Sequence, residues 1–227
     1  MSATGPAGRQ VLCFDVFGTL VDPFGIQRRL ESLVGGSAAR VTETWRQKQL
    51  EYTFRLTAMG WYRDFEWVTR RSLVYALRAT GQELRPDQVE AVMAAYADLD
   101  AYPDALEGVD GLAASGSRLA VLSNGTPRMI EAALRSARLN GRFDPVISVD
   151  EVGAFKPSPR VYERAASRLD RPLGQLMLVS SNPFDVIGAR HVGMRAAWVR
   201  RGAAVFDDFE LEPTLVVGSV TELAGRL

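Results

Sequence analysis

An apolar run from Val11 to Phe14 leads into a single acid, Asp15, and is followed closely by Gly18 and Thr19. A short apolar run bounded by turn residues predicts a buried strand of a parallel sheet, with Asp15 at its carboxyl end. Because ligands of open α/β sheets bind at the carboxyl ends of the strands, Asp15 is a candidate reactive group. Asp and Gly also open ordinary turns, so this segment alone leaves both interpretations open.

The pattern changes from strand to helix after Asp22 and stays helical to about Asp100. Apolar spacing and a proline near one start predict helices over 38–58, 64–80 and 86–99, with no strand pattern between them. A helical block inserted directly after the first strand is typical of a lid over a binding edge. We therefore expect an α/β core domain of residues 1–23 and 101–227 and a helical cap subdomain of residues 24–100.

Strand and helix patterns alternate from Tyr102 onward. Short buried strands are predicted over 119–123, 145–149, 175–180 and 194–199, with an edge strand at 215–218 and a helix after it. Alternation of this kind predicts right-handed crossovers and a doubly wound parallel sheet.

Polar side chains follow several of these strands. Thr126, Ser158 and Asn182 each precede a proline, and a cap residue followed by proline is an ordinary helix start. Taken singly, such residues are explained by capping; taken together, they place one polar set at one edge of the sheet. That set, which favours a site, is Asp15, Thr19, Ser123, Asn124, Lys156, Ser180, Asn182 and Asp185.

Composition narrows the chemistry. The 27 basic and 27 acidic residues balance, so we expect no nucleic acid or membrane partner but a small, soluble one. Without a membrane-length apolar run or a signal-peptide core at the N-terminus, a cytoplasmic location is expected. The only cysteine, Cys13, lies in an apolar strand, and the only histidine, His191, near a helix end. Nucleophilic devices built on histidine are therefore hard to assemble, which leaves carboxylate, lysine and arginine chemistry.

Four segments, FDVFGTLVD, LSNG, FKPSPRVY and VSSNPFD, resemble in this order the four motifs of the haloacid dehalogenase (HAD) superfamily. Within it the chain resembles the L-2-haloacid dehalogenases, because WRQKQLEY at 45–52 is similar to their cap sequence. The resemblance covers almost the whole chain and implies a HAD-like, Rossmann-like core with a helical cap. Phe17 and Ser181 stand where the phosphatases of the superfamily carry acids, so the resemblance implies an enzyme without metal or other cofactor.

The resemblance also implies a reaction, the hydrolysis of a carbon–halide bond. Asp15 displaces the halogen of an L-2-haloalkanoate and forms an aspartyl ester, which water hydrolyses to a D-2-hydroxy acid. Arg46 and Asn124 receive the halide, Lys156 favours the ionised nucleophile, and Asp185 activates the water. In the remaining assignments Thr19 and Ser180 orient Asp15, Asn182 and Tyr162 support the water, Ser123 holds the substrate carboxylate, and Phe17, Leu50, Phe65 and Phe184 contact the substrate.

Two other functions stay open at this point, because a fold alone does not fix an activity. A phosphatase of the same fold is weakened by Phe17 and Ser181. A catalytically inactive small-molecule-binding protein is weakened by Asp15, Lys156 and Asp185, since an inactive pocket has no chemical need for all three. A homodimer is a further expectation from the family.

Overall fold

The computed structural model describes residues 10–227. Residues 1–9 lie outside the described part. They belong to the expected core and include most of the N-terminal segment that was considered as a signal peptide. Six parallel strands form one sheet in the order β3-β2-β1-β4-β5-β6. They are β1 Val11–Phe14, β2 Arg118–Ser123, β3 Val146–Ser148, β4 Leu176–Ser180, β5 Arg195–Val199 and β6 Leu215–Val217. The strand order reverses between β1 and β4, which confirms the doubly wound sheet.

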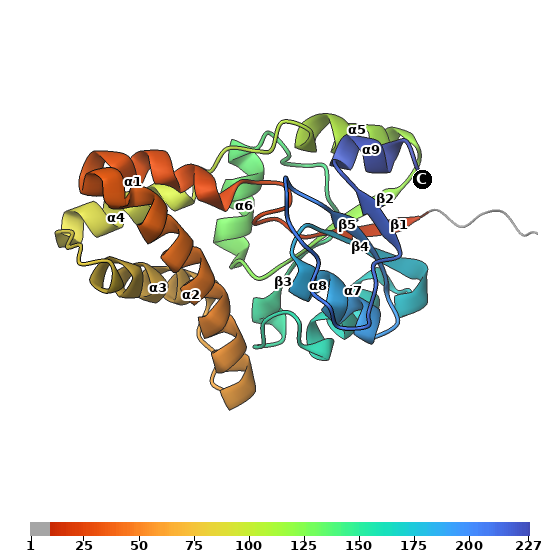
Figure 1. Ribbon diagram of the computed structural model, residues 1–227. Coiled ribbons are helices and arrows are strands. Elements are labelled where there is room, and N and C mark those ends of the chain that lie inside the picture. Colours follow the sequence, from red (N-terminus) through yellow and green to blue (C-terminus); the bar gives the residue numbers. More distant parts are fainter. Residues whose placement is uncertain (1–9) are drawn as a thin grey trace, which may run out of the picture.

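Helices cover both faces of this sheet. Figure 1 shows α5 and α9 side by side on one face and α7 and α8 on the other. The helices of this part are α5 Ala105–Ala114, α6 Pro127–Ser136, α7 Pro159–Leu169, α8 Pro183–His191 and α9 Val220–Ala224, with short 3-10 turns at Val149–Glu151 and Leu173–Gln175. Helix α5 approaches α9 so closely that a Cβ on Gly108 would lie 2.6 Å from the α9 backbone.

The segment between β1 and α5 is helical, as predicted, and lies to one side of the sheet (Figure 1). It contains α1 Gln27–Val34, α2 Ala38–Met59, α3 Phe65–Ala79 and α4 Pro86–Tyr96, with 3-10 turns at Pro23–Ile26 and Gly35–Ser37. The chain leaves and re-enters the core at neighbouring points. There the Asp22 N–H donates to the Asp100 carbonyl at 2.9 Å, and the Tyr102 N–H donates to the Leu20 carbonyl at 2.9 Å.

The predicted elements match the observed ones to within a few residues. Asp64 and Thr80, the ends of one predicted helix, are the caps of α3, and the Asp64 side chain accepts the Trp67 N–H. Strand β3 is shorter than predicted because the Ser148 hydroxyl accepts the Asp150 N–H and starts a 3-10 turn. Within residues 10–227, no helix combines the length and the apolar character that crossing a membrane requires.

Strand β1 is the centre of the core. All four of its residues are buried, as a strand with helices on both faces of the sheet requires. The Asp15 N–H continues the ladder to the Val179 carbonyl of β4 at 3.0 Å. Asp15 thus stands at the carboxyl end of the central strand, where the strand order reverses and where such sheets bind ligands.

Candidate active site

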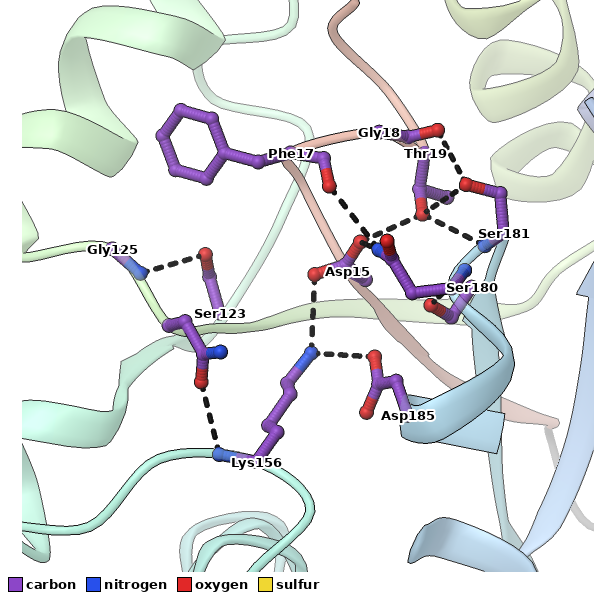
Figure 2. A network of polar contacts seen from close by, with 12 residues as sticks. Asp15, Phe17, Gly18, Thr19, Ser123, Gly125, Lys156, Ser180, Ser181 and Asp185 are labelled. Atoms are coloured by element: carbon purple, nitrogen blue, oxygen red, sulfur yellow. Dashed lines mark hydrogen bonds and ion pairs between the residues drawn. The ribbon is translucent and has the colours of Figure 1, made fainter. Parts of the chain in front are cut away.

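The carboxylate of Asp15 is held by three side-chain donors (Figure 2). Oδ2 accepts the Thr19 hydroxyl at 2.7 Å and the Asn182 Nδ2 at 2.8 Å, and Oδ1 accepts the Lys156 ammonium at 3.2 Å. Asp15 is only 6% exposed. A carboxylate with this many donors has a fixed orientation, as a nucleophile needs.

Lys156 lies between two carboxylates, those of Asp15 and Asp185 (Figure 2). Its Nζ is 2.8 Å from Asp185 Oδ2, and both side chains are buried. Burial lowers the pKa of Lys156, but Asp15 and Asp185 outweigh it and hold that pKa above its usual value. Burial raises the pKa of Asp185, against the opposing effects of Lys156 and Tyr162. The site therefore contains a firmly charged ammonium beside a carboxyl that accepts protons more readily than usual.

Tyr162 contacts Asp185 through its hydroxyl group. Its hydroxyl lies 2.9 Å from Asp185 Oδ1 and 3.1 Å from the Asp185 carbonyl oxygen. Burial and the neighbouring carboxylate raise the pKa of Tyr162 well above its usual value, so the phenol stays a donor. A Cβ on Gly188 would lie 2.5 Å from this hydroxyl, so a glycine is needed for α8 to pass so close. Tyr162 is placed to orient Asp185 rather than to line an open pocket.

The loop after β1 is fixed by the residues that follow β4. Gly18 has φ +94, a conformation that glycine adopts without strain. Thr19 donates its proton to Asp15, so its oxygen accepts the Ser181 N–H at 2.9 Å, and the Ser181 hydroxyl donates to the Gly18 carbonyl. Ser181 thus positions the loop that follows Asp15.

Asn182 and Ser180 differ from what their sequence positions indicate. Asn182 occupies the N-cap position of α8, but its side chain makes no capping hydrogen bond and turns to Asp15 and to the Phe17 carbonyl at 3.2 Å. Ser180 is predicted to orient Asp15. Its hydroxyl accepts the Asn182 N–H at 3.1 Å, so in this structure Ser180 is linked to Asp15 through Asn182.

The turn after β2 forms a second wall of the site. The Ser123 hydroxyl accepts the Gly125 N–H at 3.1 Å, and Asn124 Oδ1 accepts the Lys156 N–H at 3.0 Å. A Cβ on Gly125 would lie 2.8 Å from the Phe17 ring, so this ring packs directly on the turn. The Asn124 amide is thereby oriented with its oxygen toward the Lys156 backbone.

Aromatic rings close the site toward the helical segment. The centroid of the Phe17 ring lies 5.7 Å from that of Phe65 and 5.9 Å from that of Tyr96, and the Phe17 and Tyr96 rings are stacked. Phe184 faces Phe54 at 5.3 Å, and both rings line an apolar groove of about 490 Å³. Tyr96 was not predicted as a site residue, because an aromatic residue at the end of a helical pattern has no local feature that separates a site from the core.

Arg46 brings a charge from α2 to this site, as the resemblance implies. Its Nη2 donates to Asn182 Oδ1 at 3.1 Å, so Asn182 links Arg46 to Asp15. The nearby Leu50 is half-buried on the same helix. Five segments distant in sequence therefore meet: the ends of β1, β2 and β4, the loop before α7 that carries Lys156, and the middle of α2.

A metal would have to compete with Lys156 for the two carboxylates. Among residues 10–227, His, Cys, Asp and Glu side chains form no group of three or more able to hold a metal ion. The space between Asp15 and Asp185 already contains the Lys156 ammonium, and Ser181 supplies a hydroxyl where a hard cation prefers a carboxylate. The positive charge between the two carboxylates is thus supplied by Lys156.

Comparisons with known proteins place most of the chain in one family. The family model of the haloacid dehalogenase-like hydrolases matches residues 10–193. An (S)-2-haloacid dehalogenase of Pseudomonas putida is 37% identical over 216 residues, which cover 95% of this chain and 96% of the relative. A crystal structure of a dehalogenase superposes with a TM-score of 0.93 at 35% identity, over 98% of both chains.

One further structure bears on the chemistry. It is the L-2-haloacid dehalogenase from Xanthobacter autotrophicus with chloropropionic acid covalently bound, which has a TM-score of 0.90 at 32% identity and covers 96% of this chain and 97% of its own. Sequence and fold agree over nearly the full length. The chain therefore belongs to the haloacid dehalogenase-like hydrolases and, within them, to the (S)-2-haloacid dehalogenases.

Proposed function

We propose that this protein hydrolyses short L-2-haloalkanoic acids to D-2-hydroxyalkanoic acids through an ester on Asp15. One observation carries the assignment of the nucleophile: Asp15 is oriented by three side-chain donors at the switch point of the sheet. The covalently bound chloropropionic acid of the Xanthobacter autotrophicus relative supports an intermediate of this kind.

The first step is a displacement at the α-carbon. A carboxylate oxygen of Asp15 forms a C–O bond as the carbon–halogen bond breaks, and the halide leaves with the bonding electron pair. Attack from behind inverts the carbon, so an L substrate leads to a D product. Negative charge grows on the halogen, where the Arg46 guanidinium and the Asn124 amide are the proposed donors; donors fixed in advance of charge development lower the barrier effectively. Ser123 and the backbone amides of its turn are the proposed site for the substrate carboxylate.

The second step hydrolyses the ester. Water attacks the carbonyl carbon of the Asp15 side chain and gives one proton to Asp185. The acyl C–O bond then breaks, the departing alkoxide takes that proton from Asp185, and loss of the second water proton to solvent returns Asp15 as a carboxylate. The raised pKa of Asp185 makes this carboxylate a better proton acceptor than an ordinary aspartate. Tyr162 and Lys156 hold Asp185 in place, so the same contacts that bury it also orient it. The hydroxy acid then carries an oxygen that belonged to Asp15.

The reaction is proposed to need no metal. Lys156 supplies the positive charge between the two carboxylates, and Phe17 and Ser181 leave the site without the two further acids that metal-dependent relatives use. We also propose that residues 24–100 act as a cap over the core of residues 1–23 and 101–227. Phe17, Leu50, Phe65 and Phe184 are proposed as the apolar contacts of the substrate.

A homodimer and a cytoplasmic location stay predictions. Large apolar side chains at the end of α2 and on α3 support the first, since Met59 is 62%, Trp61 48% and Tyr75 41% exposed. Light scattering on the purified protein tests the oligomeric state, and fractionation of cells tests the location.

Halide release tests the proposed function. The separate enantiomers of 2-chloropropionate are incubated with the protein in EDTA, and chloride and the product enantiomer are measured. The proposal expects chloride and D-lactate from the L form alone, and none from Asp15→Asn. A single turnover in heavy-oxygen water places the label in Asp15 before it reaches any product. Hydrolysis of an aryl phosphate in Mg²⁺ with no chloride release would instead support a phosphatase.

A further inference from the structure

Arg46 is anchored by a chain of hydrogen bonds inside the helical segment. The Thr69 hydroxyl donates to the Phe65 carbonyl at 2.6 Å, and Gln49 Nε2 donates to the Thr69 oxygen at 2.8 Å. Gln49 Oε1 then accepts Arg46 Nη1 at 2.9 Å. These hydrogen bonds run from the first turn of α3 through α2 and end on the guanidinium, which is linked to Asp15 through Asn182.

The direction of every bond in this chain is forced. A backbone carbonyl only accepts and a guanidinium only donates. The Thr69 proton must therefore point to Phe65, the Gln49 NH₂ group must face Thr69, and the Gln49 oxygen must face Arg46. A reversed amide would place an NH₂ group against the guanidinium. Thr69 thus sets the orientation of Gln49, and Gln49 presents an acceptor to Arg46.

The hydrogen bonds on the other side of Arg46 also have fixed donors and acceptors. Asn182 Oδ1 accepts Arg46 Nη2 at 3.1 Å, so the Asn182 NH₂ group faces Asp15. The guanidinium is held between two amide oxygens, one from the helical segment and one from the core. A guanidinium has five N–H groups, so these two bonds leave others for a leaving halide.

These hydrogen-bonded side chains are shielded from water. Gln49 is 1% exposed, and Thr69 and Tyr96 are buried beside it. The Tyr96 hydroxyl lies 3.3 Å from both polar atoms of the Gln49 amide. A cavity of about 10 Å³ next to Arg46 and Gln49 has room for one water at most. Because at most one water fits beside these groups, each hydrogen bond restrains its partner strongly.

We infer that Gln49 is a positioning residue that holds Arg46 toward the leaving halide, and that Thr69 sets the orientation of Gln49. The inference rests on the proposed function, because it assumes that Arg46 receives halide. Without the Gln49 oxygen, Nη1 loses its buried acceptor and the guanidinium is free to turn from the reacting carbon. Stabilisation of the leaving group then has to be organised during the reaction, which raises the barrier.

The test compares leaving groups. Chloride leaves less readily than bromide and depends more on a positioned donor, so Gln49→Met should slow the chloro substrate more. We expect the ratio of kcat/KM for L-2-bromopropionate over L-2-chloropropionate to rise on the order of tenfold. Thr69→Val, which removes only the hydroxyl, should raise the ratio in the same direction, and Thr69→Ser, which restores it, should return the ratio to the wild-type value. A merely structural role would slow both substrates equally.

Gln47→Met is the matched control. Gln47 lies on the same helix, is exposed, and donates only to Glu43 at 3.3 Å, so the same substitution there should leave the ratio unchanged. If Gln49→Met does not fold, as judged by near-ultraviolet circular dichroism, the Thr69→Val and Thr69→Ser pair decides the matter alone.

Arg46→Lys distinguishes an error about Gln49 from an error about the role of Arg46. If this variant raises the ratio while folded Gln49→Met and Thr69→Val both keep the wild-type value, the inference is wrong and the proposed function stands. If Arg46→Lys also leaves the ratio unchanged, Arg46 does not serve the leaving group, and the inference fails with that assignment. If the wild-type protein releases no halide, the proposed function itself fails.

Discussion

Lys156 neutralises two buried carboxylates, and Lys156→Met would leave both without a counter-charge. The ammonium lies 3.2 Å from Asp15 and 2.8 Å from Asp185. At an effective dielectric constant of about 20, each pair has a Coulomb attraction of roughly 5 kcal/mol before desolvation is subtracted. Methionine keeps the volume of the lysine stem, so the change removes the charge with little loss of packing. Breaking a buried pair on one side costs about 3–5 kcal/mol of stability, which we expect here near neutral pH.

The loss should depend on pH with a definite sign. Without Lys156, burial raises the pKa of the Asp185 carboxyl with less opposition than in the wild type. A carboxyl whose pKa is higher in the folded state contributes stability below its unfolded pKa and loses it as pH rises through the folded one. The deficit of Lys156→Met should therefore be larger at about pH 8 than at about pH 5, because lower pH favours protonation of the uncompensated carboxyl.

Urea unfolding of both proteins at the two pH values measures this deficit. Lys48→Met replaces the only other lysine, which pairs with Glu51 on α2, and should cost less than about 1 kcal/mol at either pH. A deficit for Lys156→Met that is no larger than that of Lys48→Met, or that grows toward acid pH, would refute the reasoning.

Three other predictions concern single side chains. Gly108→Ala places a Cβ 2.6 Å from the α9 backbone and should lower the free energy of unfolding, measured in urea, by about 1–3 kcal/mol. As a control, Gly111→Ala meets only a methyl group at 3.4 Å and should change that free energy by less than about 1 kcal/mol. Equal values for the two variants would contradict the clash. Tyr162→Phe removes a donor that lowers the pKa of Asp185, so the acidic limb of a kcat profile should move to higher pH; an unmoved limb would exclude Asp185 as the base. Cys13, whose pKa burial raises to about 12, should resist a thiol reagent at neutral pH until urea unfolds the protein, and rapid labelling of the native protein would contradict its burial.

The sequence was most informative where chemistry follows local pattern. An apolar run that ends in Asp15 predicts a central strand with an acid at its carboxyl end, and the structure has this arrangement. Asp15, Lys156 and Asp185 could be expected at one edge, because parallel strands end on the same side.

Side-chain direction at the ends of strands and helices was not predictable in the same way. Asn182 has the sequence context of a helix cap, and nothing local shows that its side chain turns to Asp15 instead. The neighbours Ser180 and Ser181 differ by one position, and a pattern of period two does not tell which of them meets the nucleophile loop. The role of Gln49 depends on a contact with α3 and one with Arg46, and tertiary contacts of this kind leave no mark on helical periodicity.

Because the chain leaves and re-enters the core at neighbouring points, the proposed cap of residues 24–100 could be exchanged as one cassette. Because Asp22 and Asp100 are hydrogen-bonded to each other, a different helical segment could be joined there without altering the strand order. Thr69, Gln49 and Arg46 all lie within the cassette, so a grafted segment carries its own oriented arginine. The host core has to match only the contacts that cross the boundary, among them Arg46 with Asn182, Thr57 with the Phe155 N–H, and Tyr62 with Asp150.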